Sequence, residues 1–160
     1  MNSTSTLVKM ILDRWSSALQ SCDKLLNSLT DEQLNQATAP TKNNGIYILG
    51  HLIAVHDDMI RLLGFGEKVV PAYFDVFIKA PYSADATLPN AAELRLNWTK
   101  MNEVLSQKMN ALSEANWLEA HTAVSAEDFA KEPHRNKLNI ILTRTTHLTY
   151  HTGQLTLLNR

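Results

Sequence analysis

Two histidines four residues apart, His147 and His151, are the residues of this chain best placed to do chemistry. On a helix, residues four apart lie on the same face, about 40° apart around the axis. Neutral imidazoles in that arrangement can bind one metal ion through bonds of about 2.0–2.1 Å. The same spacing also fits core or interface histidines. A catalytic metal site usually has three protein ligands and one open position, so a third ligand must come from another helix.

Four other histidines are available as the third ligand. His121 and His134 fall in predicted loops, where solvated surface positions are expected. His51 and His56 lie on one predicted helix, but their spacing of five turns them about 140° apart, so they cannot share a metal ion. His51 lies among the apolar residues of that helix, whereas His56 precedes Asp57 and is expected on the solvent side. His51 is therefore the better candidate.

Four long segments carry the apolar spacing of three and four residues that is typical of amphipathic helices. They run from about Ser5 to Ser28, from Asn43 or Asn44 to Leu63, from Pro89 or Asn90 to Leu112, and from about Asn136 onwards. In the first segment, the predicted core stripe includes Leu7, Ile11, Trp15, Ala18 and Cys22. The pattern predicts an all-α four-helix bundle. Two long connections, residues 67–89 and 113–135, are expected to wall a pocket together with the end of the bundle.

Size and composition bound the class of protein. A length of 160 residues suits one compact domain, expected over residues 1–160. With 15 basic and 16 acidic residues and no basic run, the chain lacks the electrostatic footprint of a nucleic-acid-binding protein. No apolar stretch approaches the roughly 18 residues of a membrane span. The N-terminal residues lack a signal-peptide pattern, and Cys22 is the single cysteine, so a reducing cytoplasm is the expected location.

The segments Gly50-His51-Leu52 and His147-x-x-Tyr150-His151-x-Gly153-Gln154 resemble the DinB/YfiT-like superfamily, and the helical pattern matches over nearly the whole chain. The resemblance implies a four-helix bundle with a long crossover between its second and third helices. It implies a divalent metal ion held by His51, His147 and His151, and often a homodimer. Members with known activities include transferases and isomerases that use thiols such as bacillithiol or mycothiol.

A site with three histidine ligands leaves at least one coordination position open. A metal ion there can lower the pKa of bound water towards about 7, or hold a substrate thiol as the nucleophilic thiolate. The ligands alone therefore do not separate a hydrolase from a thiol transferase acting on a small molecule. Three imidazoles suit zinc, nickel, iron or manganese to differing degrees.

Three further side chains are candidate catalytic residues. Gln154 follows His147 by seven residues and lies within about 20° of it on the helix, so it is placed to orient a bound water or substrate group. Asp58 follows His51 by seven residues and is a candidate general base or a partner of an imidazole N–H. Tyr150 is a candidate hydrogen-bond donor. Each has a structural alternative: helix packing for Gln154 and Tyr150, and a salt bridge for Asp58.

Two more residues beside the histidines carry expectations. Arg144, three residues before His147, could neutralise an anionic substrate, although a solvated or salt-bridged position is the simpler expectation. Gly153 removes a side chain next to His151, which predicts the close approach of a neighbouring helix.

The alternative to an enzyme is a binding or assembly module. In such a module the histidines hold a structural metal, completed by a fourth ligand such as Asp58 or His56, or they hold no metal at all.

Overall fold

The computed structural model describes residues 3–83 and 87–159. Four long helices form a bundle, as predicted: α1 (Ser3–Ser28), α3 (Gly45–Leu62), α5 (Ala91–Asn110) and α8 (Lys137–Leu155). The connections hold short helices: α2 (Asp31–Leu34), α4 (Ala72–Phe74), the π-helix η1 (Asp75–Lys79), α6 (Glu114–Trp117), α7 (Ala126–Lys131) and, after α8, the 3₁₀-helix η2 (Thr156–Leu158). No strand occurs within the described residues, which confirms the all-α class.

Side-chain caps and glycines set the ends of the two helices that carry the histidines. The Asn44 side chain accepts a hydrogen bond from the Tyr47 N–H at 2.8 Å, and Asn136 caps α8 in the same way. At the other end of α3, Gly64 has a φ of +76°, a conformation that glycine adopts without steric cost. The Phe65 N–H then donates to the Ile60 carbonyl at 2.8 Å, which satisfies one of the last helical acceptors. These ends lie where the sequence predicts them.

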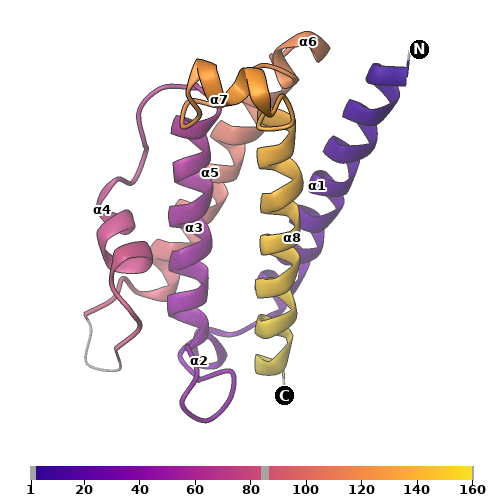
Figure 1. Cartoon of the computed structure of the whole chain (residues 1–160). Coiled ribbons are helices and arrows are strands. Elements are labelled where there is room, and N and C mark those ends of the chain that lie inside the picture. Colours follow the sequence, from indigo (N-terminus) through magenta and orange to yellow (C-terminus); the bar gives the residue numbers. More distant parts are fainter. Residues whose placement is uncertain (1–2, 84–86, 160) are drawn as a thin grey trace.

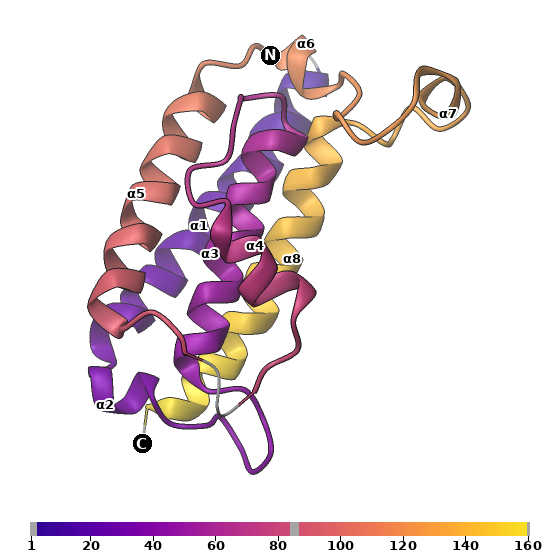
Figure 2. The same cartoon turned by 90° about the vertical axis from the view of Figure 1, so that its left-hand side faces the viewer.

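Long connections allow neighbouring helices to run parallel. Helix α3 runs parallel to α5 and antiparallel to α8, while α1 packs along α8 in the parallel direction (Figures 1 and 2). The crossover leaves the C-terminal end of α3 and lies over that helix through α4 and η1, and its last described part, residues 87–90, leads into the start of α5 (Figure 2). The long crossover between the second and third long helices is therefore present.

Helix α3 is the centre of the fold and is covered on almost every side. All of its residues are buried except three, His51, Asp58 and Arg61. The expectation that His56 faces solvent is therefore wrong: its side chain is fully buried. The prediction assumed that an amphipathic helix keeps one open face, but α1 and α5 pack over the face that carries His56.

The imidazole of His56 is held between two indole rings. Its centroid lies 5.0 Å from that of Trp15 and 4.9 Å from that of Trp98. Its Nδ1 lies 2.8 Å from Oδ1 of Asn102, whose amide nitrogen donates to the Trp98 carbonyl. Oδ1 only accepts hydrogen bonds, so Nδ1 of His56 carries the proton. Burial lowers the pKa of His56 to about 4, and the ring is neutral at neutral pH.

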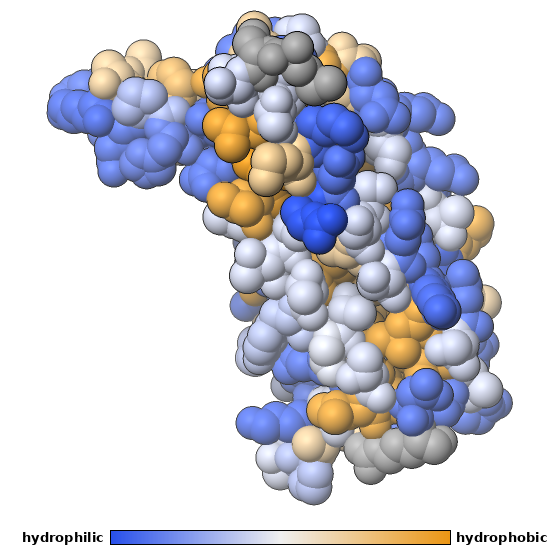
Figure 3. Space-filling view, turned by 90° about the vertical axis from the view of Figure 1, so that its right-hand side faces the viewer, coloured by the Kyte–Doolittle hydropathy of each residue, from blue (hydrophilic) through white to orange (hydrophobic). Residues whose placement is uncertain are grey.

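Two further expectations change at the outer surface. Leu7 is 57% exposed and Val8 takes its place in the core, because the stripe on α1 drifts around a helix of this length. The connection of residues 113–135 lies beyond the end of α3, where its short helix α7 projects from the bundle as a mostly hydrophilic lobe (Figures 2 and 3). None of the described helices is long and apolar enough to cross a membrane.

The burial of His56 predicts a pH-dependent stability. The unfolded chain takes up a proton near the ordinary pKa of 6.5, whereas the folded chain resists it until about pH 4. The contribution of His56 to the free energy of unfolding should therefore be greatest above pH 6.5 and fall by about 3 kcal/mol as the pH decreases to 4. Urea denaturation across this range, with a chelator present, measures the effect.

A His56→Gln variant is the matched control, because glutamine can donate to Asn102 without titrating. In the control, the free energy of unfolding should decrease less between pH 6.5 and pH 4, because the contribution of His56 is removed. The contributions of the other histidines should remain. The same pH dependence in both proteins would contradict the prediction.

Candidate metal centre

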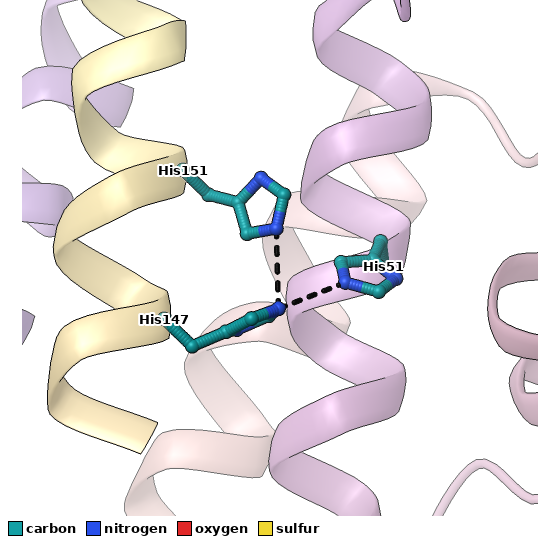
Figure 4. Close-up of side chains that lie close together, drawn as sticks. All are labelled: His51, His147 and His151. Carbon is teal, nitrogen blue, oxygen red and sulfur yellow. Dashed lines mark hydrogen bonds between the residues drawn. The ribbon is translucent and has the colours of Figure 1, made fainter. Parts of the chain in front are cut away.

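Three imidazoles from the neighbouring helices α3 and α8 converge on one point between them (Figure 4). Nε2 of His51 on α3 lies 3.1 Å from Nε2 of His147 on α8, and Nε2 of His151 lies 3.1 Å from the same atom. All three ligand atoms lie within 4.8 Å of one another, and each side chain is half-buried. The structure thus brings together the three histidines that the sequence singles out.

Two of the rings are oriented from behind by oxygen acceptors. Nδ1 of His51 donates to the carbonyl of Phe77 at 2.9 Å, and Nδ1 of His151 donates to Oε1 of Gln154 at 2.7 Å. Since both oxygens only accept, both Nδ1 atoms carry the protons of the neutral rings. The Nε2 lone pairs of His51 and His151 therefore point to the common centre. Such contacts fix the tautomer and orientation of metal-binding histidines.

The electrostatic surroundings keep the rings neutral. Burial, followed by the nearby His151, His51 and Arg144, lowers the pKa of His147 to about 3. Burial also lowers the pKa of His51 and of His151, although their hydrogen bonds at Nδ1 oppose the shift. Metal ligation requires unprotonated nitrogens, so the environment favours the binding form at neutral pH.

The donor atoms fit a small divalent ion. Bonds of about 2.0–2.1 Å at angles between octahedral and tetrahedral separate neighbouring nitrogens by roughly 2.9–3.4 Å. The two separations of 3.1 Å fall in that interval. No fourth histidine, cysteine or carboxylate joins the group within residues 3–83 and 87–159. An ion held by these three ligands would keep at least one position open.

The crossover is held against α3 at two points. The carboxylate of Asp57, buried on α3, accepts hydrogen bonds from the backbone N–H groups of Val69 at 2.6 Å and Val70 at 3.1 Å. Further along, the ring of Phe77 packs directly on Gly50, and a Cβ built at Gly50 would overlap that ring. The glycine before His51 therefore lets the crossover come close enough for the Phe77 carbonyl to reach the imidazole.

An open pocket of about 430 Å³ lies beside the three histidines. Its walls are Tyr47, Ile48 and His51 of α3, residues 77–81 of the crossover, and His151 of α8. The prediction that the 67–89 connection walls the pocket is confirmed. The prediction for the 113–135 connection is wrong, because that segment lies at the opposite end of α3 and contributes no residue to this pocket.

The predicted catalytic side chains take different positions. Gln154 contacts His151 through Oε1, and its amide nitrogen donates to the Tyr150 hydroxyl at 3.4 Å. Tyr150 is 63% exposed, and its ring centroid lies 5.1 Å from that of His151. Asp58 shares the open strip of α3 with His51, but its carboxylate pairs with Lys68 at 3.0 Å and Arg61 at 3.2 Å.

The expectation for Gly153 is wrong. It is exposed, and a Cβ built there would meet no atom within 4 Å, so no neighbouring helix uses the space. Sequence reasoning also missed two positions that build the site, Asp57 and Phe77. The run Gly50-His51 was the available signal that something packs beside the histidine, but it does not say which residue.

The packing of Phe77 on Gly50 predicts opposite effects for two glycine-to-alanine substitutions. Gly50→Ala must displace the Phe77 ring and its carbonyl, so metal affinity should fall by about 10- to 100-fold, as for other partners of metal ligands. Overpacking of about 1–3 kcal/mol should also outweigh the gain of about 1 kcal/mol from helix propensity. Competition with a chromophoric chelator and denaturant titration measure the two quantities.

Gly153→Ala is the matched control in the same site. It should raise the free energy of unfolding by about 0.5–1 kcal/mol and leave metal affinity unchanged, because the added methyl group meets open space. Equal metal affinities for the two variants would show that Phe77 does not support His51.

Comparisons with known proteins agree with this arrangement. A crystal structure described as the conserved protein of locus from Enterococcus faecalis is similar in fold, with a TM-score of 0.63 and 14% identity. The similarity covers 100% of this chain and 96% of that chain. No curated protein matches the sequence. The family model of the DinB superfamily matches residues 14–155, which is most of the chain, so the protein belongs to the DinB superfamily.

Proposed function

We propose that the protein is a metal-dependent enzyme that transfers a thiol to a small electrophilic substrate, with His51, His147 and His151 as the metal ligands. The observation that carries the proposal is the convergence of three histidine Nε2 atoms beside an open pocket, with the protons of two of the rings held at Nδ1. Structural zinc sites usually have four protein ligands. A group of three, without a fourth ligand among the described residues, supports catalysis over a purely structural role.

Zinc, nickel, iron or manganese bound there would supply a Lewis acid that holds a thiol as thiolate or activates water. The protein's own part is to hold the ligands and shape the pocket. The Phe77 carbonyl and Gln154 keep the Nδ1 protons of two rings away from the centre. Tyr47 and residues 77–81 cover one side of the pocket, where they would exclude water from a bound substrate. The exposed ring of Tyr150 lies beside His151, so its hydroxyl could meet a substrate bound at the metal ion.

The choice between thiol transfer and hydrolysis rests on the general base. Hydrolysis benefits from a side chain that takes a proton from water. Asp58, the carboxylate that the sequence offers for this role, is engaged by two cationic side chains and does not join the histidine group. A thiol, with an ordinary pKa of about 8.5 against about 15.7 for water, depends less on such a base to become the metal-bound nucleophile. The arrangement therefore favours thiol transfer, with hydrolysis as the second candidate.

Metal stoichiometry is the first test. Elemental mass spectrometry of the untagged protein should find about one zinc, nickel, iron or manganese ion per chain. A His147→Ala/His151→Ala variant should retain less than a tenth of that amount, because one imidazole is a weak site. Circular dichroism should show the same helical content in both proteins. Failure of the wild type to bind any of the four metals would point to a metal-free binding module.

Activity is the second test. The metal-loaded protein should accelerate the reaction of bacillithiol, mycothiol or cysteine with an aryl chloride, in which the thiolate sulfur bonds to carbon and chloride leaves. His51→Ala should reduce kcat/KM by at least about 100-fold, because it removes a ligand. An Asp58→Asn variant separates the mechanisms: thiol transfer should persist within a few-fold, whereas hydrolysis through an Asp58 base should be lost. Metal binding without turnover of any thiol or ester would support a non-catalytic ligand-binding role.

A further inference from the structure

Arg144 is a half-buried cation that the protein leaves without a counter-charge. It lies on α8 one turn before His147, about 4.5 Å along the helix axis. Its Nε is buried and has no hydrogen-bond partner. Within the described residues, no carboxylate lies within ion-pair distance of its guanidinium group. An unpaired, partly desolvated charge is unfavourable, so its surroundings favour an anion.

Arg95 shows how the same fold treats another arginine of similar burial. Its guanidinium donates to the carbonyls of Leu26 at 2.6 Å and Leu29 at 2.7 Å, and it pairs with Asp31 at 3.3 Å. Every side of that group thus meets an acceptor of the protein. Arg144 has none of these contacts, which distinguishes it from an arginine with a structural role.

The charges around Arg144 are directed towards the histidine group. The guanidinium lowers the pKa of His51 and His147, so it lies within electrostatic range of both. Asp58 is the carboxylate that acts on Arg144, but Lys68 and Arg61 already neutralise it. Three neutral ligands would also leave the full charge of a divalent ion uncompensated. A metal ion held by the histidines and the guanidinium of Arg144, whose residue lies one turn before His147, would thus be two positive charges in one region of the bundle. No carboxylate of the described residues joins the histidine group or pairs with Arg144.

We propose that Arg144 binds the carboxylate of a small thiol whose sulfur occupies the open position of the metal ion. This inference rests on the proposed function and adds the substrate class, a thiol that carries a carboxylate at the far end of a short chain. The planar guanidinium matches a carboxylate through paired hydrogen bonds, which a neutral thiol cannot form. Arg144 is then a residue that determines specificity, and it is not a metal ligand.

Cobalt-substituted protein allows a direct test, because thiolate binding to cobalt gives a charge-transfer absorption. The probes are 3-mercaptopropionate and 2-mercaptoethanol, which differ in the carboxylate. We define the ratio as the dissociation constant of 2-mercaptoethanol divided by that of 3-mercaptopropionate, which should exceed one in the wild type. This ratio should fall by about tenfold or more in Arg144→Gln, as expected for loss of hydrogen bonds to a charged group. Chelation of cobalt by both ends of the probe occurs in both proteins and cancels in this comparison.

Two controls accompany the measurement. Arg135→Gln removes the same charge from the 113–135 connection, where the arginine pairs with Glu132, and should leave the ratio unchanged. Cobalt content should be the same in all variants. If Arg144→Gln fails to fold, Arg144→Met takes its place, because it keeps the apolar stem of the side chain. The same change in the ratio of dissociation constants is then expected.

The outcomes separate the two proposals. A cobalt-loaded Arg144→Gln protein with the wild-type ratio would overturn the inference and leave the metal site intact. A wild type that binds both probes equally would do the same. A wild type that takes up no cobalt would overturn the proposed function together with the inference.

Discussion

The close approach of the crossover to α3 is the constraint on which the rest of the structure depends. With nearly all of its residues buried, α3 needs a cover on the side that α5 and α8 leave open, and the crossover supplies it. Phe77 can pack there because Gly50 has no side chain, and Asp57 holds the start of the same segment. One consequence is chemical, because the covering segment presents a backbone carbonyl to His51. The same residue, Phe77, thus packs in the core through its ring and orients the imidazole of His51 through its carbonyl.

Burial gives the histidines of this bundle two different outcomes. His56 is enclosed by Trp15 and Trp98 and donates its proton to Asn102, so its neutral state serves packing. The ring of His51 is also neutral, but its Nδ1 proton is held by the Phe77 carbonyl, so its Nε2 lone pair faces Nε2 of His147 at 3.1 Å. The direction of the unprotonated nitrogen, and not burial alone, distinguishes this candidate metal ligand from the structural histidine.

The parts of the site that follow from helix geometry could be predicted from the sequence. His147 and His151 share a face because their spacing matches the helical period, and His51 is separated from His56 by the same rule. The parts that depend on how separate segments pack in space could not. The contact of Phe77 and the distant position of residues 113–135 follow from the paths of irregular segments, and the burial of His56 follows from the way α1 and α5 pack on α3. Periodicity describes neither.

Glycines show the same division in another way. Gly50 and Gly153 each stand beside a histidine, and the sequence alone assigns a packing role to the second. In the structure, the first faces the ring of Phe77 and the second faces open space. A glycine signals that a side chain is missing, but only the neighbouring element decides whether its absence matters. For this reason the support of His51 lies on the covered side of α3, whereas the exposed side of α8 leaves the rim of the site open to a ligand.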